Sequence, residues 1–137
     1  MHLFIDTGNA AFSGDDRPLE VSRILTELSE ELRDYDGIEC QSQRVLRDYN
    51  GNPVGYLNQD GLPAETQPGR IVLSFNTGSA AFSEPNFGAE VSKIFKEAAD
   101  KLSGGSQAFC LRDTNGNIVG EVKDTAPEPS DFDSPFN

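Results

Sequence analysis

Two aspartates stand where a pair of carboxylates could act as general acid and general base. Asp6 follows the first apolar run of the chain, and Asp48 lies two residues before the Asn50-Gly51 pair of a predicted turn. A positioned carboxyl group can exchange protons with a substrate, which is the enzymatic interpretation of the pair. Aspartate before a turn also commonly caps that turn through its side chain, which is the structural interpretation. Because Asp6 recurs further along the chain as Asn76, while Asp48 recurs as Asp113, we favour the structural role.

Other candidate groups for chemistry are weaker. Thr7-Gly8 and Thr77-Gly78 stand between a predicted strand and a predicted helix, where phosphate-binding loops occur. Neither is followed by the glycine and lysine pattern of such loops, so we expect no nucleotide site. His2, the single histidine, has no triad partner that the sequence predicts. The sequence therefore predicts a protein that is not an enzyme and holds no cofactor and no metal.

The two cysteines are not a repeated pair. Cys110 corresponds to Val45 in the internal repeat described below, and Cys40 has no counterpart. We expect two unrelated buried thiols, since a disulfide is uncommon in a cytosolic protein.

The elements that position these residues come in two copies. An internal repeat determines architecture before any single residue does. The matching segments are residues 7–13 and 77–83, 20–24 and 90–94, and 46–55 and 111–120.

Each copy predicts the order strand, helix, strand, strand. The first strands are expected at residues 3–6 and 71–75. The first helix is expected to start after Asp15 or Asp16, because aspartate is a preferred N-cap and Pro18 suits a first turn. An Asn-Gly pair in each copy predicts a hairpin with a type I′ turn. Gly55 and Gly120, in the returning strands, indicate bulges or close backbone approach.

The fold class that follows is α+β. One apolar stripe on each helix must cover one face of a sheet. We therefore expect a two-layer sandwich with a mostly antiparallel sheet of about six strands, two helices on one face and a pseudo-two-fold relation between the copies. The predicted organisation is repeat one at 1–57, a linker at 58–69, repeat two at 70–123 and an acidic, proline-containing tail at 124–137, with the repeats forming one domain.

Net charge is the second strong feature. The 137-residue chain has a formal net charge of −12. Residues 1–60 hold 12 acids and 5 bases, whereas residues 70–123 hold 6 of each. Such a charge balance repels nucleic acid and favours a basic partner. We expect no membrane span and no signal peptide, and hence a cytoplasmic protein that is a monomer or a homodimer.

A row of carboxylates is predicted on the first helix, beside its apolar stripe. One interpretation is a solvated face that keeps the protein soluble. The other is a surface for a basic partner, because the matching helix of the second copy carries lysines among its acids. The candidate partner-binding residues are Asp16, Glu20, Glu27, Glu30, Glu31 and Asp34.

The tail offers a different surface. Residues 130–136, Ser-Asp-Phe-Asp-Ser-Pro-Phe, resemble the acidic tip of bacterial single-stranded-DNA-binding proteins, although here Asn137 follows the last phenylalanine. The resemblance implies docking to replication or recombination proteins, and the alternative is a solubilising tail. The candidate tail residues are Asp131, Phe132, Asp133 and Phe136.

The repeated unit T-G-x-A-A-F…E-V-x-x-I…L-R-D-x-N-G-N-x-V-G resembles small acidic proteins encoded by phages and prophages. The resemblance implies a viral protein acting in a bacterial host cytoplasm. It implies an inhibitor of a host nucleic-acid-directed defence complex, anti-CRISPR or anti-restriction, whose carboxylates mimic DNA phosphates opposite Lys and Arg. The alternatives are an adaptor that uses the tail, or a single-stranded nucleic-acid-binding module in which Tyr49, Tyr56 and Arg44 stack bases.

Overall fold

The computed structural model describes residues 1–33, 44–58, 62–83 and 86–125. The elements follow one another in the order strand, short 3₁₀ helix, α-helix, strand, strand, and this order occurs twice. The first five are β1 (His2–Asp6), η1 (Ala10–Phe12), α1 (Asp16–Leu32), β2 (Arg44–Arg47) and β3 (Pro53–Asn58). The second five are β4 (Arg70–Phe75), η2 (Ala80–Phe82), α2 (Phe87–Ser103), β5 (Ala108–Arg112) and β6 (Ile118–Thr125).

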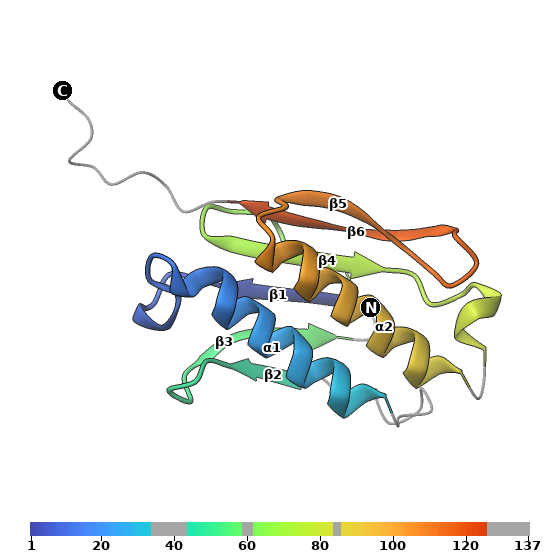
Figure 1. Cartoon of the computed structure of the whole chain (residues 1–137), viewed down its shortest axis with the longest axis horizontal. Coiled ribbons are helices and arrows are strands. Elements are labelled where there is room, and N and C mark those ends of the chain that lie inside the picture. The colour runs from blue at the N-terminus through green and yellow to red at the C-terminus, as the bar shows by residue number, and fades with distance from the viewer. Residues whose placement is uncertain (34–43, 59–61, 84–85, 126–137) are drawn as a thin grey trace.

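The strands form one open sheet in the order β2-β3-β1-β4-β6-β5, and every neighbouring pair is antiparallel. Both helices lie side by side on one face of this sheet (Figure 1). The predicted α+β fold with two layers and six antiparallel strands is therefore confirmed.

The core lies between the helices and the sheet. The predicted apolar stripe of α1, at Val21, Ile24, Leu25, Leu28 and Leu32, is buried throughout. Full burial of one such side chain contributes about 1.5–3 kcal/mol, so the stripe accounts for much of the attachment of this helix. In α2 the stripe is equally buried, at Phe87, Val91, Ile94, Phe95, Ala98 and Leu102.

The two halves of the chain meet at the centre of the sheet. β1 pairs with β4, and Leu3 stands opposite Leu73, the residue that corresponds to it in the sequence repeat. The helices α1 and α2 also pack against each other, on one face of the sheet (Figure 1). The pseudo-two-fold relation between the copies is compatible with this register and stays a prediction.

Gly55 and Gly120 occupy positions where a side chain would collide with a central strand. A Cβ at Gly55 would lie 1.9 Å from the carbonyl oxygen of Phe4, and a Cβ at Gly120 would lie 2.0 Å from that of Ser74. The expected close backbone approach is therefore confirmed at both positions.

Two expectations need correction, the type of the hairpin turn and the start of the tail, whereas the N-cap position of α1 is as expected. The hairpin loop between Asp48 and Asn52 has three residues, closed by a hydrogen bond from Gly51 N to the Asp48 carbonyl, and not a two-residue type I′ turn. Asp15 stands at the N-cap position of α1 as expected, although its side chain makes no capping hydrogen bond. Asp124 belongs to β6 and not to the tail, because it continues the pairing with β4.

Neither helix in the described part of the chain is long and apolar enough to cross a membrane.

Candidate functional site: the α1 surface and its hairpin

A buried carboxylate organises each hairpin turn. Asp48 Oδ1 accepts hydrogen bonds from the backbone N–H groups of Asn50 and Asn52, each at 2.9 Å. Its Oδ2 accepts from the side chain of Asn9, at 2.7 Å, and from that of Asn52. The hydrogen bond to Asn9 joins the hairpin to the loop that follows β1. Asp48 is therefore a turn cap, as the structural interpretation predicted.

The same arrangement recurs at the second hairpin. Asp113 accepts from the N–H groups of Asn115 and Asn117 and from the hydroxyl of Ser79, which takes the place of Asn9. Burial alone would raise the pKa of Asp113. The hydrogen bonds from Asn117 and Ser79 outweigh it, so the pKa lies below its ordinary value of 3.8. Burial would likewise raise the pKa of Asp48, but the hydrogen bonds from Asn52 and Asn9 outweigh it and lower this pKa.

The arginines that recur in the two hairpins bind backbone carbonyls and not these acids. Arg47 donates to the Gly51 carbonyl at 2.9 Å, and Arg112 donates to the Gly116 carbonyl at 3.0 Å. Asp6 forms its ion pair with Arg70 on the neighbouring strand, at 2.6 Å. Asp6 and Asp48 therefore serve separate structural contacts and do not form an acid–base pair.

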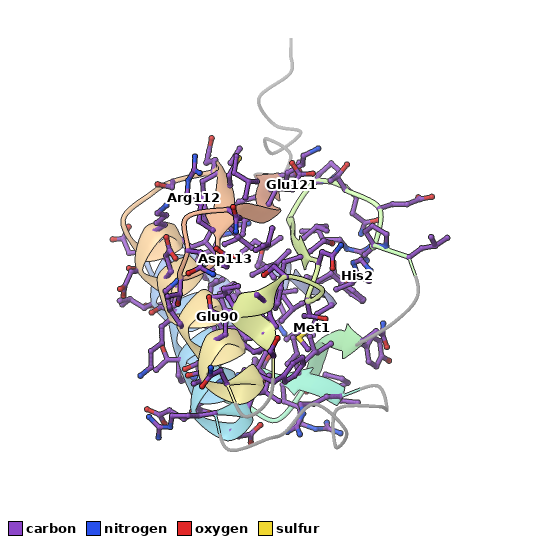
Figure 2. The ribbon with its side chains drawn as sticks, turned by 90° about the vertical axis from the view of Figure 1, so that its right-hand side faces the viewer. Met1, His2, Glu90, Arg112, Asp113 and Glu121 are labelled. Atoms are coloured by element: carbon purple, nitrogen blue, oxygen red, sulfur yellow. The ribbon has the colours of Figure 1, made fainter. Side chains whose placement is uncertain are left out.

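Glu20 was predicted to bind a partner, but its environment in the structure corrects this prediction. Its side chain is buried, at 5 % exposure, and its carboxylate accepts from the Tyr49 N–H at 2.9 Å. Arg23 also holds this carboxylate through two hydrogen bonds, which raise the pKa of the arginine. Glu20 fastens the hairpin to α1. Its counterpart Glu90, which is labelled in Figure 2, accepts from Thr114 N–H at 2.7 Å. Glu20 is therefore unavailable to a partner.

Four members of the predicted set are exposed on α1: Asp16, Glu27, Glu30 and Glu31. Glu27 pairs with Arg23 and Glu31 pairs with Arg44, with 63 % and 57 % of the respective glutamate side chains exposed. Among the described residues, no salt bridge involves Asp16 or Glu30. Asp34 lies outside the described residues.

The two helices differ in charge although they share a face of the sheet. α1 contains five acids and two bases, whereas α2 contains three of each. In α2, Lys101 takes the position of Glu31 and pairs with Glu97. The described surface is therefore more acidic over α1 than over α2, which agrees with the charge distribution in the sequence.

Sequence reasoning missed Leu19 as an exposed apolar residue, and it considered Tyr49 only as a residue that could stack bases. Leu19 on α1 is 66 % exposed, and Tyr49 in the β2–β3 turn is 61 % exposed. In the second half the corresponding residues are Ala89 and Thr114. A comparison of the two copies for apolar residues, in addition to charge, would have identified them.

The sheet face opposite the helices carries the remaining polar candidates. His2 Nδ1 lies 3.0 Å from Ser74 Oγ. The histidine therefore has a hydroxyl partner that the sequence analysis did not identify. A shallow depression of about 670 Å³ is lined by both residues and by Glu121 (Figure 2). Cys110 also lines it and is exposed, which corrects the expected burial of this thiol, while Cys40 lies outside the described residues.

The three residues expected to stack bases do not share a surface. Tyr56 packs edge-on against Phe4, with ring centroids 5.7 Å apart, on the sheet face away from the helices. Tyr49 lies in the turn that is fastened to α1, and Arg44 pairs with Glu31 of that helix. The arrangement gives no stacking platform built from this trio.

In the described part of the chain, no three His, Cys, Asp or Glu side chains are grouped so that they could hold a metal ion. The tail candidates Asp131, Phe132, Asp133 and Phe136 lie outside the described residues. No protein-family model, curated protein or solved structure matches this chain.

Proposed function

We propose that the protein is a binding protein without catalytic activity, and that the exposed face of α1 docks on a basic surface of its partner. The observation that carries the proposal is the group of exposed acids Asp16, Glu27, Glu30 and Glu31 on one helix, beside a second helix without net charge. Such a surface attracts Lys and Arg, and the net charge of −12 accelerates encounter with a basic partner.

We further propose that this partner is a nucleic-acid-directed defence complex of a bacterial host. Grooves that hold nucleic acid are rich in Lys and Arg, and exposed carboxylates can take the place of phosphates there. The resemblance of the repeated unit to phage-encoded proteins supports this choice. The protein would then act in the host cytoplasm, as a monomer or a homodimer, and would bind no nucleic acid itself.

The test compares two charge reversals with the same change in net charge. Glu27→Lys/Glu30→Lys alters the α1 surface, and Glu97→Lys/Asp100→Lys alters the corresponding positions of α2. Each variant is used in a pull-down from bacterial lysate with mass spectrometry, and in plaque counts on a host with an active CRISPR or restriction system. We expect only the α1 variant to lose the captured proteins and phage protection. Equal loss in both variants, or loss in neither, would contradict the proposal.

A truncation after Thr125 separates this proposal from the adaptor that uses its tail. Asp124 must be kept, because it forms a bidentate ion pair with Arg17 at the start of α1. We expect the truncated protein to keep its partner, whereas loss of the partner would favour the adaptor.

A further inference from the structure

Leu19 and Tyr49 are two exposed apolar side chains on the surface just proposed. They belong to a small group, because the other exposed large apolar residues in the described part of the chain are Val45, Leu62 and Ile118. Aromatic and aliphatic side chains at the centre of an interface commonly provide most of its binding energy. The pair therefore calls for an explanation that charge alone does not give.

The backbone beneath the pair is fixed by hydrogen bonds. Tyr49 N–H donates to Glu20, the residue next to Leu19, and Arg23 holds the same carboxylate through two further hydrogen bonds. Asp48 is in turn held by Asn9. A surface whose backbone is already ordered loses less conformational entropy on association.

The second half of the molecule shows that this scaffold needs neither apolar side chain. Thr114 N–H donates to Glu90 in the same way, and Ala89 stands at the position of Leu19. The Thr114 hydroxyl even adds a hydrogen bond to Glu90 at 2.6 Å. Leu19 and Tyr49 are therefore not required for the local fold.

Charge complementarity selects the partner. Asp15 and Asp16 are exposed one turn before Leu19, while Glu27 and Glu30 follow on the same helix, about 12–17 Å further along at 1.5 Å per residue. Acids that precede and follow Leu19 on the same helix match a protein surface with Lys and Arg around an apolar depression. Nucleic acid and anionic membranes are repelled by the same charges.

On the basis of the proposed function, we infer that Leu19 and Tyr49 are the apolar anchors of the α1 surface. Their partner is a protein whose apolar depression is rimmed by Lys and Arg. This inference extends the proposal from charge mimicry to recognition of a protein surface.

The test uses a displayed library of random peptides, selected on the wild-type protein. We expect enrichment of peptides that combine Lys or Arg with aliphatic or aromatic residues. Dissociation constants of the selected peptides are then measured for Leu19→Ala/Tyr49→Thr, which gives the first half the residues of the second. We expect affinity to fall at least about tenfold. The control Ile118→Thr removes an exposed apolar residue at a distant hairpin and should leave affinity unchanged.

We expect the substitutions at Leu19 and Tyr49 to leave the fold intact, because both side chains are exposed and Tyr49 donates its hydrogen bond from the backbone. Circular dichroism and thermal unfolding should match the wild type. The inference is overturned by unchanged affinity in the double variant, by an equal loss in the control, or by selection of no cationic apolar peptide. If Leu19→Ala/Tyr49→Thr keeps the lysate partner that Glu27→Lys/Glu30→Lys loses, the inference fails and the proposed function stands. If neither variant loses it, the proposed function fails.

Discussion

Asp113→Asn tests whether the buried turn cap stabilises the protein. The wild-type carboxylate receives four hydrogen bonds: Asn115 N and Asn117 N on Oδ1, and Ser79 Oγ and Asn117 Nδ2 on Oδ2. The substitution turns Oδ2 into an amide nitrogen that faces two donors. A hydrogen bond to a charged group contributes about 1.5–3 kcal/mol, and the Ser79 hydroxyl can rotate to accept. We therefore expect a loss of about 2–3 kcal/mol in the free energy of unfolding.

The assay is urea unfolding at neutral pH, followed by thermal unfolding. For a chain of this length we expect the Tm to fall by about 10 °C. The control Asp100→Asn changes an exposed aspartate of α2 and should stay within about 0.5 kcal/mol of the wild type. A loss at Asp113 as small as that of the control would refute the assignment of Asp113 as a stabilising cap.

The pH dependence gives a second check on the same residue. The pKa of Asp113 is lowered in the folded state, so its carboxylate contributes full stability above the ordinary value of 3.8 and loses it as pH falls through the lowered pKa. Asp113→Asn does not titrate at this position. The stability difference between the two proteins should therefore be constant from neutral pH to about pH 5 and should shrink below pH 4.

Two further predictions concern stability, beside the functional variants above. Gly120→Ala should lower the free energy of unfolding by about 3 kcal/mol, because the new Cβ would lie 2.0 Å from the Ser74 carbonyl oxygen. In the control Gly116→Ala the new Cβ meets open space, and the positive φ alone should cost about 1 kcal/mol. Urea unfolding of both measures the contrast, and equal losses would contradict it. Arg17→Met should cost about 3 kcal/mol, because it leaves the Asp124 carboxylate, 9 % exposed, without its bidentate partner. The second substitution Asp124→Leu should restore much of the loss in the same assay, and no restoration would mean that the charge was not the cause.

The sequence predicts the layers of this fold well because burial on one side of a helix leaves a periodic signal. Leu25 and Leu28 lie where the spacing places them, and Gly120 marks the close approach expected of a strand glycine. Position on the helix did not predict the environment of Glu20. On a helical wheel Glu20 lies beside the exposed Glu27. Glu20 is nevertheless buried, because the β2–β3 hairpin, which is distant in the chain, packs over it.

The turn and the tail boundary were misjudged for two different reasons, one local and one long-range. Asn50-Gly51 alone favours a two-residue turn, yet the two hydrogen bonds from backbone N–H groups to Asp48 stabilise a longer loop. Asp124 looks like the first residue of an acidic, proline-rich tail, yet it pairs with β4 and forms an ion pair with Arg17, over 100 residues away. Such long-range contacts leave no periodic signal.

The pairing of Leu3 with Leu73 has a consequence for how the chain folds. The hairpins β2–β3 and β5–β6 close short loops, whereas the central pair β1–β4 joins residues about 70 positions apart. Closing a long loop costs more entropy, and non-local pairings slow folding. We expect the hairpins to form early, and the centre of the sheet to assemble late. The rate of refolding after dilution from urea should then be limited by the association of the two halves. The central strands β1 and β4, the most buried of the native sheet, would pair last.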